Sequence, residues 1–144
     1  MRDPVEPKNL ESVASRLGEL ADATPDPAAS SHLRTLQDAL DAIARGDLAS
    51  VLASAVEDVA LDIYAPPEFP FVRTARGADA FRAALRHNFA AVEDQRPEVR
   101  DLFADGDRIV LLGRETGVIR HSGLTYDVEF VERFTFRDAR LASV

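Results

Sequence analysis

The chain contains no cysteine, which excludes a disulfide framework, a thiol nucleophile and a metal site with cysteine ligands. Its 3 His residues form no HExxH motif, and there is no Asp-rich loop, so we expect neither a metal nor a cofactor. The first residues, MRDPVEPKNLE, lack the apolar run of a signal peptide. No stretch of about 18 apolar residues is available to span a membrane. From these absences we expect a cytoplasmic protein without a membrane partner.

Basic residues are also scarce, with 17 Lys and Arg against 25 Asp and Glu, and the net charge is −8. Nucleic-acid binding draws most of its affinity from cations placed on phosphates, so we expect no nucleic-acid partner. The 144 residues suffice for one domain with a sizeable core. A hydrophobic fraction of 46% with 29% charged residues is typical of a soluble globular protein.

The most informative stretch runs from Arg108 to Arg137, where β-branched and aromatic residues crowd two arms around Ser122-Gly123. This pattern predicts one long β-hairpin with a two-residue turn. That turn would place Glu132 opposite Gly113, with Glu115 as its diagonal neighbour. Because side chains alternate, one face of the hairpin would carry these two carboxylates among apolar residues. The other face is half apolar, so we expect a homodimer that pairs through it.

The rest of the chain predicts helices before and between strands. A short helix from Leu10 is stopped by the proline-rich stretch 23–31, and a second helix carries a stripe from Leu33 to Ile43. Asp47 is predicted to cap a third helix. The sequence then predicts a strand over 57–64, a loop over 65–77 folded onto something apolar, a helix extending to Val92, and strands at 98–104 and from Leu141. This order favours an α+β fold with helices on one face of a curved antiparallel sheet.

This layout resembles the NTF2-like superfamily, whose cystatin-like members include SnoaL-like polyketide cyclases and ketosteroid isomerases. Four stretches carry the resemblance: ALDAIARGDLASVLASAVEDVALDI, RGADAFRAALRHNF, DGDRIVLLGRETG and YDVEFVERFTFRDARL. It implies a cone in which a curved antiparallel sheet wraps around helices and encloses a pocket. It covers most of residues 33–144, so we divide the chain into an N-terminal extension over 1–30, with a short helix, and an NTF2-like domain over 31–144.

The ketosteroid isomerase branch can be compared residue by residue. Its oxyanion-hole acid falls on Glu132, its general base on Ile63 and its oxyanion tyrosine on Ala39. Two of the three roles are therefore missing, which argues against steroid isomerase chemistry. Strand alternation is expected to turn Asp62, the neighbour of the base position, away from the pocket. Ala139 stands where the family prefers Gly for a left-handed turn, so we expect strain at that bend.

Glu132 and Glu115 are the candidate catalytic residues. Apolar walls should raise the pKa of Glu132, and a second carboxylate nearby should raise it further. Three hypotheses remain open: an isomerase, cyclase or lyase that works by proton transfer through Glu132, a pocket that only binds an apolar small molecule, and a dimeric structural domain with a filled cavity. The candidate pocket residues are Ile63, Phe69, Phe71, Ile119, His121, Tyr126, Phe130 and Phe134.

Overall fold

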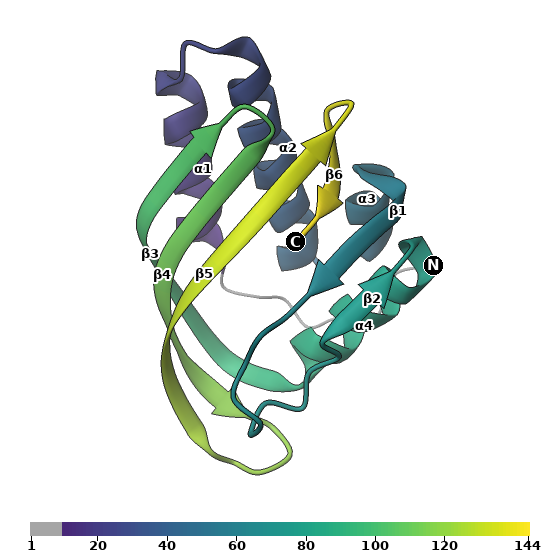
Figure 1. The fold of residues 1–144 in the computed structure, drawn as a ribbon. Coiled ribbons are helices and arrows are strands. Elements are labelled where there is room, and N and C mark those ends of the chain that lie inside the picture. Colours follow the sequence, from purple (N-terminus) through teal and green to yellow (C-terminus); the bar gives the residue numbers. More distant parts are fainter. Residues whose placement is uncertain (1–9) are drawn as a thin grey trace.

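A computed structural model describes residues 10–144 as an α+β fold with one six-stranded sheet. Ten elements follow one another along the chain: α1 (Glu11–Ala23), α2 (Pro27–Ala44), α3 (Leu48–Ala53), β1 (Ala55–Asp62), β2 (Thr74–Arg76), α4 (Ala78–Ala90), β3 (Val92–Asp105), β4 (Arg108–Ile119), β5 (Thr125–Arg137) and β6 (Arg140–Ser143). The strand order is β2-β1-β6-β5-β4-β3. The three long strands β3, β4 and β5 bend along their length, and the helices lie to one side of the sheet (Figure 1). Every pair is antiparallel except β1–β6, which is parallel.

Helices α2 and α3 begin where an aspartate side chain satisfies a free backbone N–H group. Asp26 accepts a hydrogen bond from Ala28 N ahead of α2, and Pro27 occupies the first turn, where its missing N–H costs nothing. Asp47 accepts from Ser50 N at 3.1 Å, which confirms the predicted cap of α3. The second helix therefore begins earlier than the stretch 23–31 suggested, since only residues 24–26 separate α1 from α2.

The main core lies between the helices and the inner face of the sheet. It includes Leu17 of α1, Leu33 of α2 and Phe81 of α4, all nearly inaccessible to solvent. Arg16 of α1 also donates to Val99 O of β3 at 3.2 Å. The first helix thus packs into the same core as the rest of the domain, although the resemblance left it unexplained.

The long hairpin forms as predicted, but its turn is longer. Ile119 N donates to Leu124 O at 2.8 Å, so the turn has four residues, and Gly123 takes a left-handed φ of 73° at its end. Glu132 therefore faces Leu111, and Glu115 faces Val128. The predicted pairing of Glu132 with Gly113 is wrong by two residues. Because side chains alternate with a period of two, this slip leaves every side chain on its predicted face.

A second correction concerns the end of α4. The sequence placed Val92 on the helix, but α4 ends at Ala90 and Val92 begins β3. Its place on the helical stripe gave a misleading signal, because a buried residue at the start of a strand can satisfy the same spacing. β3 is consequently far longer than the predicted strand over 98–104, and it forms an edge of the sheet, where Pro97 is tolerated.

The bend between β5 and β6 carries backbone strain. Asp138 and Ala139 have φ values of 52° and 61°, so both central residues of this turn are left-handed. This geometry suits Asp-Gly far better than Asp-Ala, because a Cβ is disfavoured there. We expect Ala139→Gly to raise the free energy of unfolding by about 1 kcal/mol, as measured by urea denaturation.

The control for this replacement is Ala49→Gly, at an exposed position in α3. It should lower stability by about 1 kcal/mol, because glycine is a poor helix former. Equal losses in both variants would show that the turn carries no strain.

Candidate functional site

A cavity of about 720 Å³ lies between the inner face of β4 and β5, helix α4 and the loop that follows β1. Most of its wall is apolar, and its aromatic side chains are Phe69, Phe71, Phe89 and Phe130. The cavity opens at a gap in the sheet. β6 pairs with β5 only at residues 135–137, so the rest of β5 has no strand on that side. Consecutive residues 128–133 of β5 line the cavity. Because neighbouring side chains point to opposite faces of a strand, the edge of β5 must itself face the cavity.

Glu132 lies on the wall of this cavity. Its side chain is accessible to solvent at the cavity surface, while the surrounding apolar wall reduces its hydration. Among the described residues, none donates a hydrogen bond to its carboxylate. Burial, and secondly the negative charge of Glu115, raise the pKa of Glu132 to about 7. Near neutral pH this group is therefore present in both protonation states.

Glu115 lines the same cavity but has partners. Tyr126 donates from its hydroxyl to Glu115 Oε2 at 2.6 Å, and Gln95 Nε2 donates to the same oxygen at 3.3 Å. Burial and this contact with Glu115 raise the pKa of Tyr126 above its ordinary value, so the tyrosine stays a donor. Two donors on one oxygen fix the orientation of the carboxylate and leave Oε1 without a protein partner among the described residues.

The two carboxylates are not neighbours. Glu115 is level with Val128, and Glu132 lies four residues farther along β5. That is roughly 13 Å of strand at about 3.3 Å per residue. The pair Gly113 and Phe130 lies between them. The wall therefore has two separate acidic positions with an aromatic ring in the middle.

Two glycines make room for the aromatic rings. A Cβ on Gly113 would lie 2.7 Å from Phe130 Cζ, and one on Gly117 would lie 2.5 Å from the Tyr126 hydroxyl oxygen. Each ring thus occupies the space above the glycine opposite it on β4. The missing side chains bring Phe130 to the cavity wall and the Tyr126 hydroxyl to Glu115.

The loop over residues 65–73 closes one side of the cavity. Arg73 donates to three carbonyl oxygens of this loop, those of Ala65, Pro66 and Phe69, at 2.6 to 3.0 Å. Asn88 of α4 accepts from Val72 N at 2.8 Å and donates to Val72 O at 3.1 Å. Phe69 is only 8% exposed and packs edge-on against Tyr126, with ring centroids 5.0 Å apart. The prediction that this loop folds onto apolar side chains is confirmed.

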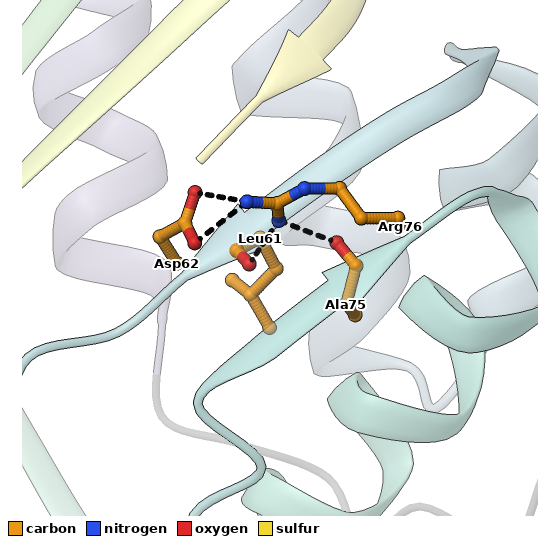
Figure 2. Close-up of polar contacts among 4 residues, drawn as sticks. All are labelled: Leu61, Asp62, Ala75 and Arg76. Carbon is orange, nitrogen blue, oxygen red and sulfur yellow. Dashed lines mark hydrogen bonds and ion pairs between the residues drawn. The ribbon is translucent and has the colours of Figure 1, made fainter.

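Asp62 lies at the rim of the cavity, where it is held by Arg76 (Figure 2). Arg76 donates to the two carboxylate oxygens at 2.9 and 3.1 Å, and also to Leu61 O and Ala75 O at 3.0 Å. The arginine therefore ties β1 to β2 while it neutralises the carboxylate. The prediction that Asp62 turns away from the pocket is wrong, because the residue lines the cavity at its rim, where its exposed carboxylate is engaged in this ion pair.

The predicted pocket residues fall into two groups. Ile63, Phe69, Phe71 and Phe130 line the cavity together with Glu115 and Glu132. Ile119, Tyr126 and Phe134 are buried outside the lining: Ile119 and Tyr126 pack with Phe69, and Phe134 belongs to the main core. His121 lies on the exposed β4–β5 turn, beside a separate cavity of about 330 Å³ that His87 also lines. Alternation predicts the face of a residue, whereas its depth depends on packing.

Several wall residues escaped the sequence analysis. Leu85, Asn88 and Phe89 of α4 line the cavity, although their helix was predicted. Gln95 was missed because β3 was begun too late, and Asp94, with a φ of 54°, interrupts the pairing of β3 and β4 beside it. Pro97 within the strand was the available signal for an irregular edge strand.

The structure places only two of the three positions compared with ketosteroid isomerases on the cavity wall. Glu132 and Ile63 lie on the cavity wall, whereas Ala39 is buried between α2 and α3. The position of the general base therefore carries the hydrocarbon side chain of Ile63, which cannot accept a proton. Across residues 10–144 no group of three or more His, Asp or Glu side chains is placed to hold a metal ion. No helix in that range is long and apolar enough to cross a membrane.

Comparison with known proteins agrees with this architecture. The family model of the SnoaL-like domain matches residues 36–144, which is most of the chain. The chain belongs to the SnoaL-like family. No curated protein matches the chain. The family match begins within α2, so α1 and the first turns of α2 precede it.

Solved structures show the same fold. An NTF2-like protein from Burkholderia xenovorans LB400 is 29% identical, with a TM-score of 0.70 over 78% of this chain and 85% of that one. An NTF2-like protein of unknown function from Burkholderia pseudomallei K96243 is 25% identical, with a TM-score of 0.64 over 78% and 86%. A candidate SnoaL-like polyketide cyclase from Jannaschia sp. CCS1 is 17% identical, with a TM-score of 0.70 over 83% and 86%, and shows the fold alone.

Proposed function

We propose that this SnoaL-like protein binds an apolar small molecule in the cavity and moves a proton on it through Glu132. The observation that carries the proposal is an unpartnered carboxylate on an apolar wall, with a pKa raised to about 7. A carboxyl group poised near the working pH can take a proton from a substrate and return it elsewhere.

The reaction class is an isomerisation, cyclisation or elimination that needs no cofactor. In its ionised form Glu132 would accept a proton from a carbon next to a carbonyl group, and in its neutral form it would deliver one to an oxygen or carbon of the ligand. Glu115 would assist as a fixed hydrogen-bond acceptor, because Tyr126 and Gln95 hold its orientation. A ligand that displaces water from the apolar wall would strengthen its own electrostatic interactions there.

Titration of Glu132 tests the acid–base role. The pH dependence of its side-chain carboxyl signal can be followed by NMR, with Glu132→Gln assigning the resonance. We expect a midpoint near 7. A midpoint at the ordinary value of 4.5 would remove the acid–base role, because the group would be fully ionised at neutral pH.

A pocket that only binds its ligand is the alternative, and two residues favour it. Ile63 and Ala39 stand where ketosteroid isomerases carry a base and a tyrosine, so those two groups are missing. Ligand binding that survives in Glu132→Gln, together with an absence of turnover in the native protein, would support this alternative.

We also propose that two copies pair through the outer face of the sheet. Phe103 and Val131 are 55% and 69% exposed there. Val110 is level with Phe103, and Leu112 is level with Val131, so the four form one apolar patch. Such a patch on a small protein marks an interaction surface, and a second copy offers the same patch in return.

Val131→Asp should convert the dimer into a monomer, because a two-fold interface would bury the new charge twice. Light scattering coupled to gel filtration measures this. Thr125→Asp, at an exposed position on the same face of β5, is the control and should remain dimeric. A monomeric native protein at millimolar concentration would refute the pairing.

A further inference from the structure

The polar atoms inside the cavity offer hydrogen-bond acceptors and almost no donors. Glu132 has no donor among the described residues, and Glu115 uses only Oε2 for Tyr126 and Gln95. Gln95 Oε1 is buried without a partner. The amide of Asn88 is occupied in both directions by Val72. A ligand that meets these groups must therefore supply donors.

The charges of the cavity wall also favour a ligand that supplies hydrogen-bond donors. The one cation among the described lining residues is Arg133, which is exposed and level with Val110 on the outer face. The other charged groups of the lining are carboxylates: Asp62 and Glu129 pair with Arg76 and Arg100 outside the lining, whereas Glu115 and Glu132 have no cationic partner among the described residues. An anionic ligand would place like charges together in an apolar enclosure, which is strongly unfavourable.

We propose that the ligand of this cavity is an apolar, ring-containing molecule with a protonated amine, and that the amine binds Glu115. Aromatic rings of Phe130, Phe69 and Phe71 supply the apolar contacts, and their faces also attract a cation. The amine donates to the free Oε1 of Glu115, while Glu132, farther along the strand, faces the other end of the molecule. This inference rests on the proposed function, because it assumes that the cavity binds a small molecule.

Three anthracene derivatives test the inference, since they share one apolar body and differ only in one substituent: aminomethyl, hydroxymethyl or carboxylate. Binding can be followed by their own fluorescence anisotropy, because the protein has no Trp to interfere. We expect the amine to bind about tenfold more tightly than the alcohol, since charge-assisted hydrogen bonds are the stronger kind. The carboxylate should bind most weakly.

Two variants locate the amine. Glu115→Gln still accepts from Tyr126 and should abolish the tenfold preference for the amine over the alcohol. Glu132→Gln should retain most of that preference. Val128→Trp, which fills the cavity beside Glu115, should weaken all three probes and shows that they bind inside.

The outcomes separate the two proposals. An alcohol that binds as tightly as the amine, with both displaced by Val128→Trp, overturns the amine inference and leaves the ligand site intact. A preference for the amine that persists in Glu115→Gln also overturns it. No binding of any probe, or binding insensitive to Val128→Trp, counts against the cavity as a ligand site and therefore against both.

Discussion

Glu132→Gln is expected to be more stable than the native protein at pH 8 and equally stable near pH 4. The pKa of Glu132 is about 7 in the folded protein and near 4.5 in the unfolded chain. Between these values the folded state holds more protons, so native stability falls as pH rises through this window. The stabilising contribution of the neutral carboxyl is complete below pH 4.5 and is lost above pH 7. Glutamine keeps the shape of that neutral form at every pH.

The size of this effect is about 1 to 2 kcal/mol at pH 8, after a discount for the water that reaches Glu132 in the cavity. Urea denaturation of both proteins from pH 4 to pH 8 measures it as a difference, so other titrating groups cancel. Glu19→Gln on α1, where the side chain is exposed, controls for the loss of one negative charge. Parallel stability curves for Glu132→Gln and the native protein would mean that the cavity does not disfavour the charge.

Gly113→Ala is expected to lower the free energy of unfolding by roughly 3 kcal/mol, the upper end for an overpacked core. Its Cβ would lie 2.3 Å from Glu98 O on β3 and 2.7 Å from the ring of Phe130 on β5. The carbonyl belongs to the backbone of a paired strand, so β3 and β4 must separate to relieve the contact. The ring can move only into the cavity.

Gly117→Ala is the matched comparison, because the three atoms nearest to its Cβ would all belong to the side chain of Tyr126. That ring can shift if it gives up its hydrogen bond to Glu115, so we expect a smaller loss of about 1 to 2 kcal/mol. Urea denaturation ranks the two variants. Equal stability of Gly113→Ala and the native protein would show that β3 and β4 lie farther apart at this point.

The sequence predicted the faces of the long hairpin better than its pairing. Residues that alternate between apolar and polar reveal which side is inward, and a slip of two residues leaves that unchanged. The length of the turn decides the pairing, and Ser122-Gly123 resembles a two-residue turn although Arg120 and His121 belong to it as well. For this reason Glu132 was correctly placed on the inner face, yet its relation to Glu115 was wrong.

The depth of each inner residue could not be predicted in the same way. Tyr126 and Phe130 share a face and a strand, but Phe130 reaches the cavity while Tyr126 is buried under Phe69. That difference comes from the loop over residues 65–73, whose path depends on distant contacts with Arg73 and Asn88. The fold itself was predictable because helix caps, strand alternation and the family resemblance agreed with one another.

Gly113 and Gly117 have a consequence for relatives of this protein. The reach of Phe130 and Tyr126 depends on two opposing positions that carry no side chain. A methyl group at either one would tilt a ring and alter the space left for a bound molecule, with no change to any polar residue. Ligand preference within the family should therefore vary with the residues at these two positions even where both carboxylates are retained.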